Sequence, residues 1–167
     1  MAQKISGRAK ERKAAKKPLL SEKLSTERAR KRSPDAESRL NISLIDASLE
    51  GNAAKMKRLL KQGADPNSKN TPGMTALMTA AASGKGDACK LLIENGADVN
   101  LKDIYGETAL HAAASKGDAK VCRLLAENGA DMDWRDMYGE TALQKAKDAG
   151  HAETAAYLKK AMKGAKG

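Results

Sequence analysis

A 33-residue period runs through most of this 167-residue chain and constrains its fold more than any other feature. Equivalent glycines at Gly73, Gly106 and Gly139 mark one phase of the period. Residues 70–102 and 103–135 are identical at 15 of 33 aligned positions. A period of about this length is typical of stacked-repeat proteins, in which one unit is too small to bury its apolar face alone. The sequence therefore predicts a solenoid rather than a single central core.

Each unit contains the same order of local features, which are clearest in the third unit. A turn at Gly106 is followed by Thr108, whose hydroxyl suits the start of a short helix predicted over 109–116. Gly117 is suited to end that helix in the left-handed conformation, and Asp118 is suited to begin a second one. The repeat region is therefore expected to be all-α, with about eight antiparallel helices.

These units resemble the ankyrin repeat. The resemblance rests on residues 103–114, on Leu124-Leu125 and on Gly129-Ala130-Asp131, and the second unit matches through residues 73–100. It implies an ankyrin-like helical solenoid of four turn-helix-loop-helix repeats with short β-hairpin turns. We place the repeat domain at 37–167, with repeats at about 37–69, 70–102, 103–135 and 136–167.

The two terminal units depart from the pattern of the inner units. In the first, Leu40 replaces the turn glycine and Ile42 replaces the threonine. In the last, Lys145 and Lys147 flank Ala146, where the inner repeats have small or apolar residues. Terminal repeats of a solenoid need a polar outer face. We therefore expect the first and last repeats to be solvent-facing caps.

The positive charge of the chain is concentrated before the repeats. Residues 1–39 contain 13 Lys/Arg and 5 Asp/Glu, whereas residues 40–167 contain 18 and 16. Residues 1–36 have few large apolar side chains, and we expect them to form a disordered basic N-terminal tail. Its basic clusters comprise Lys10, Arg12, Lys13, Lys16, Lys17, Arg28, Arg30, Lys31 and Arg32.

Three interpretations of the tail remain open. The first is an arm that binds nucleic acid phosphates, the second is a nuclear import signal, and the third is a solubilising tail or a tether for an acidic partner. The absence of aromatic residues before residue 40 weakens sequence-specific nucleic-acid recognition, because such binding usually includes base stacking. Ser33 lies between basic residues and Pro34, and we hypothesise that it is a phosphorylation switch.

The sequence contains no arrangement that predicts catalysis, a metal site or a cofactor site. The resemblance implies a structural role for His111, hydrogen-bonded within and between repeats, and we interpret His151 in the same way. We find no nucleophile–base pair, no metal-ligand spacing and no phosphate-binding glycine loop. We therefore predict a non-enzymatic protein without metals or cofactors.

Cys89 and Cys122 are 33 residues apart and occupy equivalent positions. Helices in adjacent layers lie about 8–10 Å apart, farther than the roughly 7 Å that a disulfide allows between Cα atoms. We expect both cysteines to be buried, reduced thiols in an intracellular, cytoplasmic protein, with a nuclear location an option in a eukaryote. No segment approaches the roughly 18 apolar residues of a membrane span, so no membrane association is expected.

Large apolar residues gather at the predicted turns, which are normally polar. In ankyrin-like folds the turn tips and first helices line the concave face, where partners dock. Trp and Tyr are enriched at binding hot spots, although side-by-side packing of the turns explains the same pattern. The predicted partner-binding residues are Met74, Ile104, Tyr105, Glu107, Trp134, Met137, Tyr138 and Glu140, with the two glutamates adding negative charge beside the apolar tips.

The function predicted from the sequence is that of a monomeric scaffold or adaptor that binds a protein partner through its hairpin tips and concave face. The alternative is a nuclear or nucleic-acid-associated regulator, in which the basic tail binds nucleic acid or an import receptor. Fold alone does not name the partner, because function depends on the surface side chains that a fold carries.

Overall fold

The computed structural model describes residues 33–164, which belong to one compact unit, Arg32–Gly167. The predicted disordered basic tail covers residues 1–36, and its part at residues 1–32, which includes all the basic clusters, lies outside the described residues, so the predictions made for it stay predictions. Residues 33–164 form eight helices and no strand, and the only β-type pairing among them is an isolated antiparallel bridge between Lys69 and Thr75. The all-α prediction is confirmed.

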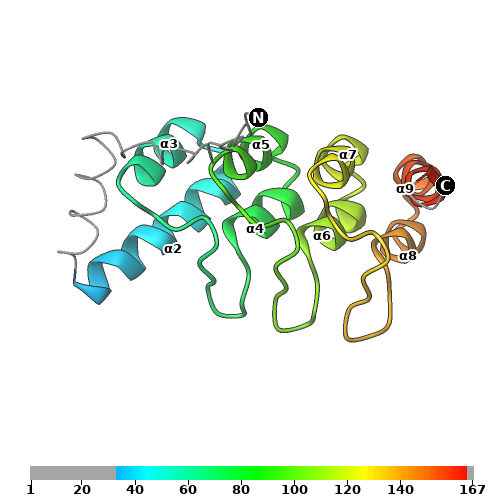
Figure 1. The fold of residues 1–167 in the computed structure, drawn as a ribbon, viewed down its shortest axis with the longest axis horizontal. Coiled ribbons are helices and arrows are strands. Elements are labelled where there is room, and N and C mark those ends of the chain that lie inside the picture. The colour runs from blue at the N-terminus through cyan, green and yellow to red at the C-terminus, as the bar shows by residue number, and fades with distance from the viewer. Residues whose placement is uncertain (1–32, 165–167) are drawn as a thin grey trace, which may run out of the picture. The chain divides into compact units, whose positions relative to one another are not determined.

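The helices stack in chain order as two rows (Figure 1). The inner row lies beside the hairpin loops and contains α2 (Pro34–Glu50), α4 (Ala76–Ala82), α6 (Ala109–Lys116) and α8 (Ala142–Asp148). The outer row contains α3 (Ala53–Lys61), α5 (Gly86–Glu94), α7 (Ala119–Glu127) and α9 (Ala152–Gly164). Each helix packs against the other helix of its own repeat and against the equivalent helix of the next repeat. The helical solenoid follows from this repeated pairing.

The core is a series of thin layers that repeat with the sequence period. Leu44, Leu77 and Leu110 are fully buried on successive inner helices, and Leu92 and Leu125 on successive outer helices. Most of the remaining buried apolar residues are alanines, whose small side chains let neighbouring helices approach closely. Full burial of one leucine contributes about 1.5–3 kcal/mol. Each layer is therefore stabilised by a few leucines and by contact with both neighbouring layers.

Cys89 and Cys122 are buried free thiols on α5 and α7, as predicted. Burial, followed by the negative charge of Asp118, raises the pKa of each thiol to about 12. Both thiols are therefore neutral and act as small apolar core residues.

The loop that joins α6 to α7 is built by local sequence signals. Gly117 closes α6 with a φ of 79°, a left-handed conformation that glycine adopts readily. The Asp118 carboxylate accepts hydrogen bonds from the N–H groups of Lys120 and Val121, and so caps α7. Both predictions are confirmed.

The first repeat differs from the expected turn-helix-loop-helix unit. α2 is 17 residues long and begins at Pro34, inside the segment assigned to the tail. Proline at the first helical position has a suitable φ, and Asp35 and Glu37 in the first turn favour the positive end of the helix dipole. Leu40 and Ile42 stand where the other repeats have the turn glycine and threonine, and the helix continues through them. This repeat therefore has no hairpin of its own.

Candidate functional site

A hairpin joins the outer helix of each of the first three repeats to the inner helix of the next repeat. Each of these three hairpins begins with an Asn or an Asp. The side-chain Oδ1 atoms of Asn70, Asp103 and Asp136 each accept a hydrogen bond from the backbone N–H four residues later, at 2.9, 2.9 and 3.0 Å. Asn and Asp commonly organise turns in this way. This role of the three residues was not predicted, although their 33-residue spacing is visible in the sequence.

Neighbouring hairpins are joined to one another by backbone hydrogen bonds. The N–H of Ile104 donates to Pro72 O at 3.3 Å, and the N–H of Met137 donates to Tyr105 O at 2.9 Å. At Gly106 the φ is 74°, and an added Cβ would lie 3.3 Å from the nitrogen of Met137. Glycine is therefore required there both by the turn and by the close approach of the next hairpin.

Four of the predicted partner-binding residues form an exposed apolar surface, which we call the tip patch. It consists of Ile104 (64% exposed), Tyr105 (44%), Met137 (62%) and Tyr138 (67%). The two pairs occupy equivalent places on consecutive hairpins, which the backbone hydrogen bonds hold side by side. Large exposed apolar groups at hairpin turns are characteristic of interaction surfaces.

Trp134 and Met74 do not belong to the exposed tip patch, because both are partly buried. The Trp134 Nε1–H donates to Gly106 O at 2.9 Å. Lys102 places its ammonium 3.1 Å from the centroid of the Trp134 ring. Met74 packs against the hydrophobic core. These contacts are those of side chains that pack against neighbouring parts of the same chain.

Lys145 on α8 is surrounded by three carboxylates, a group that we call the carboxylate cluster. Its Nζ lies 2.7 Å from Glu107 Oε1, 2.9 Å from Asp136 Oδ2 and 3.1 Å from Glu140 Oε2. The Lys145 side chain is only 18% exposed, so the expectation that it faces solvent as a capping residue is wrong. The expectation holds for Lys147, which is exposed on the same helix. The difference arises because the hairpins cover one side of α8 with carboxylates.

The carboxylate cluster favours the charged form of its two most buried members. Burial alone would raise the pKa of Asp136, but hydrogen bonds from Lys145 and from the N–H groups of Glu140 and Tyr138 outweigh it and lower that pKa below 3.8. Burial likewise opposes ionisation of Lys145, but hydrogen bonds to the three carboxylates, first to Glu107, raise its pKa above 10.5. The negative charge expected from Glu107 and Glu140 is therefore neutralised in part.

The two histidines have structural roles, as predicted. His111 is buried, with Nδ1 2.9 Å from the Thr108 hydroxyl and Nε2 3.2 Å from Glu140 O. It thus links the start of α6 to the following hairpin. His151 has Nε2 3.0 Å from Ser115 O and links the last repeat to the one before it.

No group of three or more His, Cys, Asp or Glu side chains within residues 33–164 is arranged to hold a metal ion. In the carboxylate cluster an ammonium group occupies the place between the carboxylates. In the same part of the chain, no helix is both long and apolar enough to cross a membrane.

Comparison with known proteins agrees with this geometry. A family model described as ankyrin repeats (3 copies) matches residues 44–136 and 87–166. A search of curated proteins found no match. The family match begins within α2 and continues through α9, and so spans all four helix pairs. Because the match covers well over half of the chain, the chain belongs to the ankyrin repeat family, whose members are generally non-enzymatic modules for protein–protein interaction.

Proposed function

We propose that this chain is a non-enzymatic scaffold or adaptor that binds a protein partner through the tip patch and the adjacent face of the inner helices. The observation that carries the proposal is the exposure of Ile104, Tyr105, Met137 and Tyr138 at the ends of two consecutive hairpins. Covering apolar surface contributes about 25 cal/mol per Å² removed from water. A partner that covers these four side chains therefore gains a central apolar contact.

The hairpins that carry the patch are well suited to binding because their backbones are already fixed. Asp103 and Asp136 each accept two backbone hydrogen bonds within their own turns. The bond from Met137 N–H to Tyr105 O joins the two turns. Little backbone entropy is lost when a partner binds to a surface that is already ordered. Tyrosine has few rotatable bonds and is enriched at binding hot spots.

Affinity capture with a matched pair of variants tests the proposal. Tyr105→Ser with Tyr138→Ser removes the aromatic rings of the tip patch. Ile42→Ser with Leu49→Ser removes two apolar side chains of similar exposure (53% and 55%) from α2. All four side chains are exposed, so both variants should fold normally by circular dichroism.

We expect quantitative mass spectrometry to show partner proteins that are captured by the wild type and by the α2 variant but lost from the tip variant. If the tip variant captures the same proteins as the wild type, the tip patch is not the binding surface. The alternative function depends on the basic residues between 10 and 32 of the tail, and no observation on residues 33–164 favours it.

A further inference from the structure

The tip patch lies directly beside the carboxylate cluster. Glu107 and Glu140 follow Tyr105 and Tyr138 by two residues on the same hairpins. The Nζ of Lys145 lies 5.8 Å from the centroid of the Tyr138 ring. A segment that covers the Tyr138 ring is therefore also close to the carboxylates, and its chemistry has to suit both surfaces.

We propose that the partner segment bound by the tip patch carries a Lys or Arg side chain flanked by apolar residues. In this arrangement the apolar residues cover the tip patch, and the cation contacts Glu107 and Glu140 beside the Tyr138 ring. The inference rests on the proposed function and adds to it the chemical class of the partner.

The charge balance of the cluster is the first argument for a basic segment. Three carboxylates share one ammonium, which leaves negative charge in excess. Asp136 is fully buried and already engaged by its own chain, because Oδ1 accepts two backbone N–H groups and Oδ2 lies 2.9 Å from Lys145 Nζ. The excess therefore belongs to Glu107 and Glu140, whose side chains are 32% and 35% exposed and which each contact Lys145 through one oxygen.

The cost of covering these glutamates is the second argument. A neutral apolar segment would remove water from Glu107 and Glu140 without replacing its hydrogen bonds, which is unfavourable. An acidic segment would add repulsion to the same penalty. A guanidinium or ammonium group donates charge-assisted hydrogen bonds to the carboxylates and is attracted to an aromatic face. A basic side chain is therefore the group that can offset the loss of water from Glu107 and Glu140 when the surface is covered.

Cations elsewhere on these hairpins are held by their own chain. Lys102 lies over the Trp134 ring. The Nη1 of Arg135 donates to Gly139 O at 2.7 Å. These interactions direct both side chains to partners other than Glu107 and Glu140.

Selection from a random peptide display library on the full-length chain tests the inference. The most enriched peptides, and copies with each Lys or Arg replaced by Gln, are then titrated by fluorescence anisotropy. The variants are Glu107→Gln with Glu140→Gln, each of these changes alone, and Tyr105→Ser with Tyr138→Ser. Glu94→Gln with Glu127→Gln is the charge-matched control, because both glutamates are exposed on outer helices.

We expect the enriched peptides to contain Lys or Arg next to apolar residues and to bind at least about tenfold more weakly to the Glu107→Gln/Glu140→Gln variant, because charge-assisted contacts are lost. The control should bind as the wild type does. Should the double variant fail to fold, the single substitutions give the same test with smaller losses.

Two different failures are separable. The inference is overturned, and the proposed function stands, in either of two cases, provided that the peptides lose affinity for the Tyr105→Ser/Tyr138→Ser variant. In the first case the enriched peptides lack basic residues. In the second they bind the Glu107→Gln/Glu140→Gln variant as well as they bind the wild type. Peptides whose binding survives the tyrosine substitutions, or a selection that yields no peptide dependent on them, count against the proposed function itself.

Discussion

Replacement of Lys145 by methionine tests the central electrostatic feature of the fold. Methionine keeps a long, flexible side chain on α8 but removes the ammonium that three carboxylates share. Asp136, which is fully buried, would lose its only cationic contact among the described residues. Glu107 and Glu140 would lie near it without a compensating charge. We therefore expect the hairpins of the third and fourth repeats to be destabilised.

The magnitude follows from burial. Removal of one partner from a buried ion pair costs about 3–5 kcal/mol. The Lys145 side chain is 18% exposed, and Asp136 Oδ1 retains its two N–H donors, so both facts favour the lower end of the range. We expect a loss of about 3 kcal/mol in the free energy of unfolding. For a domain of this size, about 4 °C of Tm per kcal/mol gives a decrease of about 12 °C.

The assay is thermal and urea unfolding followed by circular dichroism, with Lys147→Met as the control. Lys147 is two residues away on α8 and exposed, so its substitution should change stability by no more than about 0.5 kcal/mol. Asp136→Asn and the double variant Lys145→Met/Asp136→Asn complete a double-mutant cycle, which measures the interaction energy between the two side chains. The double variant should lose less than the sum of the single losses, by about 1–3 kcal/mol, because the two side chains interact directly.

The reasoning is refuted if Lys145→Met melts within about 2 °C of Lys147→Met, since the cluster would then contribute no more than an ordinary exposed ion pair. Strict additivity in the cycle would refute the direct coupling of Lys145 and Asp136.

The pH dependence has a defined sign. The pKa of Asp136 is lowered below 3.8, so its contribution is complete above that value and is lost as the pH falls through the folded pKa. The pKa of Lys145 is raised above 10.5, so its contribution is complete below that value and is lost only as the pH rises through the folded pKa. The stability difference between wild type and Lys145→Met should therefore be largest near neutral pH and decrease as the pH falls into the range in which the carboxylates become protonated. Urea unfolding at each pH measures it, and a difference that grows in acid would contradict this sign.

Three further experiments test other parts of the structure. Gly106→Ala and Gly139→Ala both place alanine at a positive φ (74° and 78°), which costs about 1–2 kcal/mol each. Of the two, only Gly106 has backbone of the next hairpin 3.3 Å from the added Cβ. Urea unfolding should therefore show a larger loss of stability for Gly106→Ala. Cys89 and Cys122, with pKa values near 12, should resist a thiol reagent at pH 8 until the protein unfolds, and rapid labelling of the native protein would contradict their burial. Trp134→Phe removes the indole N–H that donates to the neighbouring hairpin and should lower stability by about 1 kcal/mol, measured by thermal unfolding; an unchanged Tm would show that this bond contributes nothing.

Much of the fold could be predicted from the sequence because its features are local or periodic. The bounds of α6 agree with the predicted helix at 109–116, because Gly117 closes it by a backbone preference of its own. The burial of Cys89 and Cys122 followed from their 33-residue spacing, which gives each repeat the same environment. The exposure of the tip patch was expected for the same reason, since it occupies turns that recur with the period.

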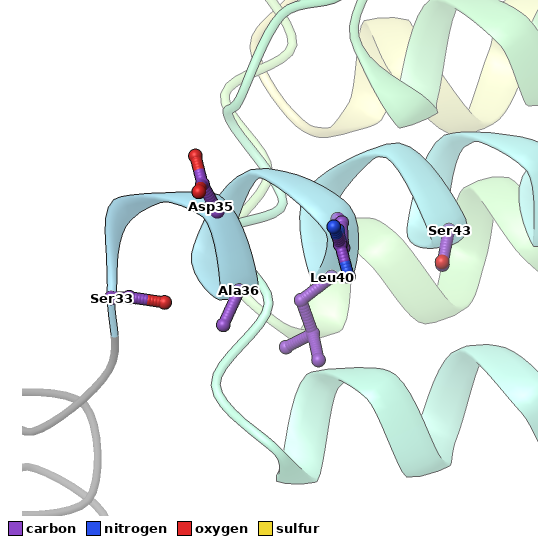
Figure 2. A pocket seen from close by; sticks show the side chains of 6 residues that line it. Ser33, Asp35, Ala36, Leu40 and Ser43 are labelled. Atoms are coloured by element: carbon purple, nitrogen blue, oxygen red, sulfur yellow. The ribbon is translucent and has the colours of Figure 1, made fainter.

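The start of the repeat domain was less predictable. The loss of the turn residues at Leu40 and Ile42 was visible in the sequence, but its consequence was not. Ser33 stands at the N-terminal boundary of α2 (Figure 2), without a side-chain capping hydrogen bond, and Pro34 begins the helix inside the segment that was assigned to the tail. A proline that is unfavourable for a preceding helix is favourable for a following one, and local sequence does not decide between these roles.

The sequence by itself determined the stacked-repeat architecture, the order of the helices and which residues reach the hairpin turns, because each of these depends on a short motif and a fixed spacing. Only the tertiary structure decided the environment of Lys145, Trp134 and the two glutamates. Lys145 meets Glu107 across adjacent repeats, and Trp134 donates to Gly106 on the preceding hairpin. These contacts join residues far apart in the sequence. They depend on how closely the layers stack, and that distance is set by the packing of all the repeats together.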